Sequence, residues 1–124
     1  MAVSQNIEAC ILHIHTIVHG GKIASAFHPN SLTRLFITHI HADHNIGIPS
    51  ILMMPWYLGR TKPMEIYGPV GIEHLVGHVI KAWQPDVKAQ SAVIGVASKG
   101  WYANAHDLDI PLSKIIYEDD NVKV

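Results

Sequence analysis

Four side chains of the types that commonly bind metal ions fall within six consecutive positions, His39-Ile40-His41-Ala42-Asp43-His44. Residues two apart in an extended chain point to the same side, so we expect His39 and His41 to face one cation. Beyond the strand end the backbone turns and can direct Asp43 and His44 toward a second cation. Imidazole and carboxylate suit zinc and similar ions, and a metal pair about 3.5–4 Å apart can hold a hydroxide and polarise a phosphoryl or carbonyl oxygen. The spacing therefore predicts a divalent-metal site.

Histidine is abundant, with ten in 124 residues, so its placement has to decide which residues could bind metal. His74 and His78 lie four apart on a predicted helix, a spacing that can bind zinc. The glutamate that directly follows the first histidine in such zinc motifs is absent here. We therefore favour the interpretation that both histidines lie on a solvated helix face. His13 and His15 could share a strand face near His19, but no carboxylate lies close to them in the sequence.

Two further groups of polar residues can be explained as solvent-exposed residues without a binding role. His106, Asp107 and Asp109 form a set of ligand types, which we interpret as surface residues on a connecting strand or loop. Arg60 and Lys62 lie in a basic loop. They could contact a phosphate backbone, and a solvated loop explains them equally well.

The histidine-rich stretch belongs to a longer pattern. Residues 38–44, Thr-His-Ile-His-Ala-Asp-His, resemble the H-x-H-x-D-H signature of the metallo-β-lactamase superfamily. Residues 59–69, Gly-Arg-Thr-Lys-Pro-Met-Glu-Ile-Tyr-Gly-Pro, followed by Gly71, resemble the G-R-x-x-P-(L/M)-x-(I/V)-Y-G-P-x-G segment of its ribonuclease Z and arylsulfatase-like branch. Residues 45–49 and 116–124 also resemble that branch. The resemblance covers about residues 22–124 and is weak over 88–113.

The resemblance implies roles for the matching positions. His39 and His41 would bind one zinc ion and Asp43 and His44 the other, with Asp43 also orienting or deprotonating the attacking water. A complete site would hold two Zn²⁺ ions, with Mn²⁺ as the alternative metal. The implied reaction is hydrolysis of a phosphodiester by a zinc-activated water, as in the endonucleolytic maturation of tRNA 3′ ends. Sulfate or lactone esters are the alternative substrates within the same superfamily.

Two departures from that family suggest a partial copy. Residues 1–21 do not align with its Gly-rich N-terminal hairpin region, and its later metal-binding histidine, bridging aspartate and final histidine have no counterparts here. We therefore expect residues 1–124 to form a single incomplete domain, half of a four-layer αβ/βα sandwich. Half of that sandwich would leave an apolar sheet face open, which favours a homo-oligomer or a complementing chain. The rival function is then a catalytically inactive or partner-completed metal-binding fragment.

The elements that must position the histidines follow from the apolar pattern. We expect a buried parallel strand over 32–38, a helix over 45–58 with Pro55 as a kink or break, and a short strand over 64–67. Pro69 suits the first turn of a helix over 70–83, which Pro85 should end. A hairpin is expected over 113–124. Residues 9–18 could form a strand or a buried helix, and 22–27 a helical turn or two. This alternation predicts an α/β fold, a mixed sheet with helices on one face.

Composition limits the classes of protein to which this chain can belong. Hydrophobic residues make up 48% and charged residues 15%, which favours a folded chain with a core. The formal net charge of −1 provides no general attraction for a polyanion. The single cysteine, Cys10, excludes an internal disulfide. We find no secretory signal and no apolar run of about 18 residues, so we expect a cytoplasmic protein without a membrane partner.

Overall fold

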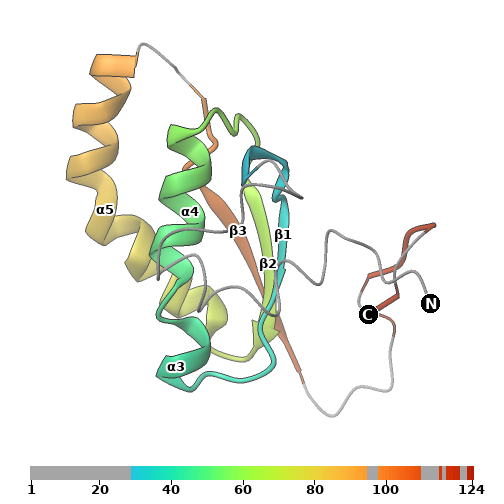
Figure 1. The fold of residues 1–124 in the computed structure, drawn as a ribbon. Coiled ribbons are helices and arrows are strands. Elements are labelled where there is room, and N and C mark those ends of the chain that lie inside the picture. Colours follow the sequence, from blue (N-terminus) through green and yellow to red (C-terminus); the bar gives the residue numbers. More distant parts are fainter. Residues whose placement is uncertain (1–28, 95–97, 110–114, 116, 121–122) are drawn as a thin grey trace.

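The computed structural model describes residues 29–94, 98–109, 115, 117–120 and 123–124, which form a small α/β unit (Figure 1). The predictions for 9–18 and 22–27, and those for Cys10, His13, His15 and His19, lie outside the described residues. The elements in chain order are η1 (Pro29–Ser31), β1 (Arg34–Phe36), α3 (Ala42–Asn45), α4 (Ile48–Tyr57), β2 (Met64–Pro69), α5 (Ile72–Ile94) and β3 (Ala103–Leu108).

The three strands form one parallel sheet in the order β1-β2-β3. Leu35 pairs with Ile66, and Ile66 pairs with Ala105. Because parallel strands end at the same edge of a sheet, the segments that follow β1, β2 and β3 emerge together. The α/β class is confirmed. No strand of this sheet is antiparallel among the described residues, so the antiparallel member of the expected mixed sheet does not occur there.

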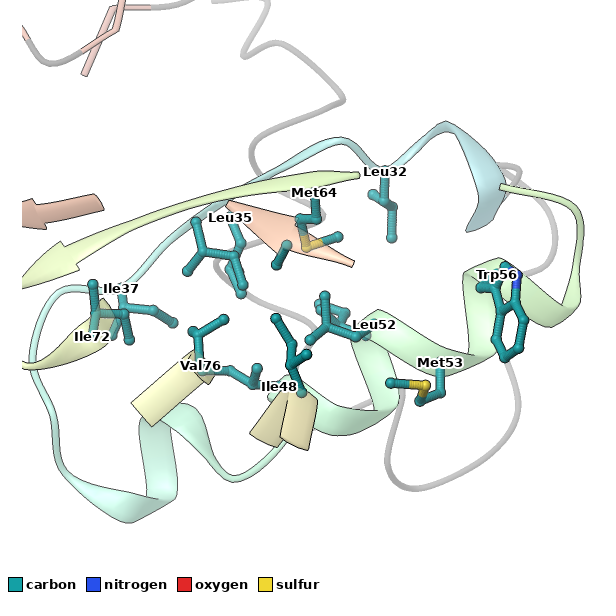
Figure 2. Close-up of a cluster of buried hydrophobic side chains, with 14 of the residues drawn as sticks. Leu32, Leu35, Ile37, Ile48, Leu52, Met53, Trp56, Met64, Ile72 and Val76 are labelled. Carbon is teal, nitrogen blue, oxygen red and sulfur yellow. The ribbon is translucent and has the colours of Figure 1, made fainter. Parts of the chain in front are cut away.

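Both long helices pack on one face of the sheet, as expected. Residues of β1 and β2 and of α4 and α5 belong to one hydrophobic cluster of buried side chains. In Figure 2, Leu35 and Met64 of the sheet reach toward Ile48, Leu52 and Val76 of the helices. All five are at most 1% exposed, so this contact forms the centre of the core.

The opposite sheet face is aromatic and polar. Tyr67 stacks between Phe36 and His106, with ring centroids 5.2 and 4.6 Å apart. Glu65 Oε2 lies 2.7 Å from His106 Nε2, and Asn104 Nδ2 donates to Glu65 Oε1 at 2.7 Å. Burial acts to raise the pKa of Glu65, but the hydrogen bonds from His106 and Asn104 outweigh it and lower that pKa. The sequence predicted an apolar surface on this side of the sheet. That prediction is wrong, because polar side chains lie beside the aromatic rings there. Coverage of this face by a second copy or a complementing chain stays a prediction.

Arg60 is the one charged side chain buried among the described residues, at 2% exposure. Its guanidinium donates to the carbonyls of Leu32 (3.3 Å), Ile51 (3.1 Å) and Leu52 (2.8 Å), and twice to that of Gly100 (2.9 and 2.7 Å). Both interpretations of Arg60 from the sequence, a phosphate contact or a solvated loop residue, are therefore wrong. Burial lowers its pKa to about 10, which leaves it charged at neutral pH.

Pro55 explains one of these bonds. In a regular helix the carbonyl of Ile51 accepts from the N–H four residues later, and Pro55 has no N–H. Arg60 Nη1 takes that vacant acceptor at 3.1 Å. The helix therefore continues through Pro55 to Tyr57.

Two predicted helix limits are wrong for identifiable reasons. Pro69 ends β2 and does not begin a helix, because Gly71 has a φ of +107°, outside the helical region, and α5 begins only after it. Pro85 does not end the helix, which runs to Ile94. The carbonyl freed by Pro85 belongs to Lys81, and both residues are exposed, so water can satisfy it. Figure 1 shows α5 bent along its length.

The described part of the predicted hairpin shows antiparallel pairing. Glu118 and Lys123 form an antiparallel bridge. Tyr117 and Val124 exchange backbone hydrogen bonds of 3.2 and 2.8 Å. Among the helices of the described ranges, none is long and apolar enough to cross a bilayer.

Replacing Arg60 tests the role of its guanidinium. Arg60→Met leaves four buried carbonyls short of a donor, and each such group costs about 1–3 kcal/mol, so we expect the free energy of unfolding to fall by at least about 3 kcal/mol. Arg60→Lys, with a single ammonium, should give a smaller loss. Urea unfolding measures both, with Lys62→Met at an exposed position of the same loop as the control. A stability of Arg60→Met equal to that of Lys62→Met would contradict the assignment.

Two glycines should respond oppositely to alanine. A Cβ at Gly100 would lie 1.7 Å from the Arg60 carbonyl oxygen, so Gly100→Ala must displace backbone and should cost about 1–3 kcal/mol. A Cβ at Gly77, within α5, meets nothing within 4 Å, so Gly77→Ala should stabilise by about 0.5–1 kcal/mol. Melting temperatures that moved in the same direction would show that the turn at Gly100 is not packed as described.

Candidate metal centre

The histidine cluster lies where β1 leaves the sheet. Ile37 continues the pairing of β1 by donating its N–H to the Tyr67 carbonyl at 2.8 Å, and the chain then passes through His39 and His41 into α3. Asn45 is buried, and its Nδ2 donates to the His41 carbonyl at 3.0 Å. That bond fixes the turn between strand and helix.

Glycines of the 59–71 segment make room for this turn. A Cβ on Gly68 would lie 3.1 Å from the Cβ of Ile37, and one on Gly71 would lie 3.2 Å from Cδ1 of Ile40. The end of β2 thus packs closely against the residues on either side of His39. This contact gives the glycine pattern a structural reason: it sets the path of the chain that carries the histidines.

The structure brings the three predicted imidazoles together, with His39 in the middle. The ring centroids of His39 and His41 are 4.8 Å apart at an interplanar angle of 83°, and those of His39 and His44 are 4.0 Å apart at 49°. His39 Nδ1 lies 3.0 Å from Thr38 Oγ1, a contact that can orient the ring. Asp43 Oδ2 lies 3.4 Å from His44 Nε2, so the carboxylate belongs to the same cluster.

The donor types fit a divalent cation such as zinc, because neutral imidazole nitrogens and a carboxylate are its usual ligands. His41, Asp43 and His44 are exposed, so their side chains can turn without disturbing the core. In the geometry described, however, no three His, Cys, Asp or Glu side chains in the described ranges are placed to hold one ion. A closed ligand set therefore requires side-chain rotation. The predicted division of the four residues between two ions stays a prediction.

The other candidates have structural partners. His106 is half-buried on β3 and pairs with Glu65, a partner that sequence reasoning missed because it lies 41 residues away. Asp107 accepts from the backbone N–H groups of Gly71 and Glu73, both at 2.9 Å, at the start of α5. Glu73 Oε1 in turn accepts from the Asp107 N–H at 3.1 Å. Asp107 is thus exposed, as predicted, and ties β3 to α5.

Asp107 gives a pH dependence whose sign follows from these bonds. The backbone donors at Gly71 and Glu73 favour the ionised form and hold the pKa of Asp107 below its ordinary value. Its contribution to stability is therefore complete above the unfolded pKa of about 3.9 and is lost as the pH falls through the lower folded value. We expect Asp107→Asn to melt at a lower temperature than the wild type near neutral pH. The gap should narrow on acidification, and a gap independent of pH would contradict this role.

Comparison with known proteins finds partial similarity. No family model matches the chain. The chain is 30% identical over 91 residues to proteins named Ribonuclease BN from Salmonella paratyphi B, Salmonella heidelberg and Salmonella typhimurium, and the match covers 63% of this chain. The chain spans about 30% of the length of these relatives.

These findings correct the family assignment made from the sequence. Membership as a partial copy of the metallo-β-lactamase superfamily, in its ribonuclease Z and arylsulfatase-like branch, is not supported, because no family model matches. The supported statement is narrower: part of the chain is similar, at 30% identity, to proteins named Ribonuclease BN.

Proposed function

We propose that this chain contributes to a ribonuclease-type hydrolase and that His39, His41, Asp43 and His44 bind its divalent cation. One observation carries the proposal: three imidazoles and a carboxylate gather at the carboxyl end of β1. In open α/β sheets, ligands bind outside the carboxyl ends of the strands. The similarity to proteins named Ribonuclease BN supports the choice of reaction.

The chain's own residues have distinct tasks in this proposal. The imidazoles of His39, His41 and His44 and the carboxylate of Asp43 hold the cation, with Zn²⁺ as the first choice and Mn²⁺ as the second. Asp43, exposed beside His44, accepts a proton from the attacking water at a carboxylate oxygen or orients that water. The bound ion would polarise the phosphoryl oxygen and lower the pKa of the water.

The proposed substrate is a phosphodiester, and in the finer form of the proposal it is a tRNA precursor cleaved near its 3′ end. Arg60 takes no part in holding the RNA, because its guanidinium is buried against carbonyls. The net charge of −1 likewise provides no general attraction for RNA. Contacts to the phosphates must therefore come from the cation and from local basic side chains.

Turnover by the full chain tests this proposal. With Zn²⁺ or Mn²⁺ added, we expect hydrolysis of bis(p-nitrophenyl) phosphate and cleavage of a tRNA precursor. His41→Ala should lower both rates by about 100-fold or more, because it removes a metal ligand. Gln84→Ala, at an exposed position of α5 outside both histidine groups, serves as the control and should leave both rates unchanged.

Each other outcome has a defined meaning. Equal rates for His41→Ala and the wild type would contradict the site. A folded chain that binds metal, measured by calorimetry, but shows no turnover would contradict the hydrolase and favour the metal-binding fragment. Turnover of an aryl sulfate or a lactone, without turnover of the phosphodiester, would show that the hydrolase acts on those esters instead.

A further inference from the structure

A second histidine pair lies on α5, outside the cluster at the end of β1. His74 and His78 are one helical turn apart, and their ring centroids are separated by 4.2 Å at an interplanar angle of 41°. Both residues are exposed, whereas Val76 and Ile80 of the same helix are buried in the core. The two rings therefore meet on the solvent side of a helix whose other side is fixed by packing.

One hydrogen bond fixes which ring nitrogen of His78 is free to bind a metal. Its Nδ1 lies 2.8 Å from the His74 carbonyl oxygen. A carbonyl only accepts, so Nδ1 carries the proton, and the lone pair of a neutral His78 is on Nε2. Metal-binding histidines commonly donate their other ring N–H to a carbonyl in this way, which fixes the tautomer and the ring orientation.

The chemistry of the pair restricts the ions that it can hold. Two neutral imidazoles without a carboxylate suit copper, nickel and zinc and are poor ligands for Mg²⁺ or Ca²⁺, which prefer oxygen. Lys81 is exposed about one turn beyond His78. Its positive charge further weakens the binding of Mg²⁺ and Ca²⁺, which are held mainly by electrostatic attraction. Among the divalent first-row ions, Cu²⁺ binds nitrogen ligands most strongly.

We propose that His74 and His78 form a two-ligand surface site for a first-row transition-metal ion of the Cu²⁺, Ni²⁺ or Zn²⁺ class. Water completes the coordination of the ion. The site is independent of the function proposed for His39, His41, Asp43 and His44.

Paramagnetic broadening by Cu²⁺ alone, followed by NMR on the full chain, tests the site locally. Cu²⁺ should broaden the amide signals of residues 72–82, in addition to any signals near the separate cluster at the end of β1. In His74→Ala or His78→Ala, the concentration needed for this broadening should rise by about 100-fold, because the second imidazole no longer acts at high effective concentration. Gln84→Ala, an exposed residue of the same helix, should leave the broadening unchanged.

Moving one histidine along α5 tests whether copper binding depends on the spacing of the two histidines or only on their number. The double variant His78→Ala/Lys81→His keeps two histidines on α5 but places them seven residues apart, about 10.5 Å along the helix axis. One ion cannot span that distance, so this variant should behave like His78→Ala. Broadening as strong as in the wild type, in either single variant or in the relocated variant, would overturn the proposal.

Discussion

The fold around the candidate site depends on the buried guanidinium of Arg60, which within the described ranges bonds to backbone carbonyls and to no carboxylate. The Arg60 guanidinium binds the carbonyl of Leu32 just before β1, carbonyls of α4, and that of Gly100 shortly before β3. A buried charge is costly unless hydrogen bonds replace its water, and here backbone carbonyls from three segments do so. The same bonds satisfy the Ile51 carbonyl that Pro55 leaves without a donor. Arg60 thus fastens the amino-terminal side of the sheet to α4.

The opposite edge of the sheet carries the candidate metal site, whose position depends on close packing. A Cβ on Gly68 or Gly71 would lie only 3.1 Å from Ile37 Cβ or 3.2 Å from Ile40 Cδ1, so a larger residue at either position would require Ile37 or Ile40 to shift. Asn45 then holds the turn through the His41 carbonyl. One stretch of sequence, residues 59–71, therefore supplies both the buried arginine at one end of β2 and the glycines at the other.

Local patterns predicted the elements well where the determinants were local. The apolar run at Leu35 marked β1, and the spacing of Ile72, Val76 and Ile80 marked α5. The pattern could not show that Pro85 would be tolerated, because that depends on which side of the helix faces water. It also could not show the burial of Arg60 or the pairing of Glu65 with His106. Their partners lie up to 40 and 41 residues away and meet only through the strand order. The histidine cluster was found because its members are neighbours in sequence, but their ring geometry was not predictable.

The most direct test of the metal centre is a crystal structure of the zinc-loaded protein with anomalous diffraction recorded at the zinc edge. We predict an anomalous peak among His39, His41, Asp43 and His44, with ligand distances near the roughly 2.0–2.2 Å usual for zinc with nitrogen and oxygen. A zinc-saturated crystal with no peak there, or with these four side chains pointing away from one another, would contradict the account.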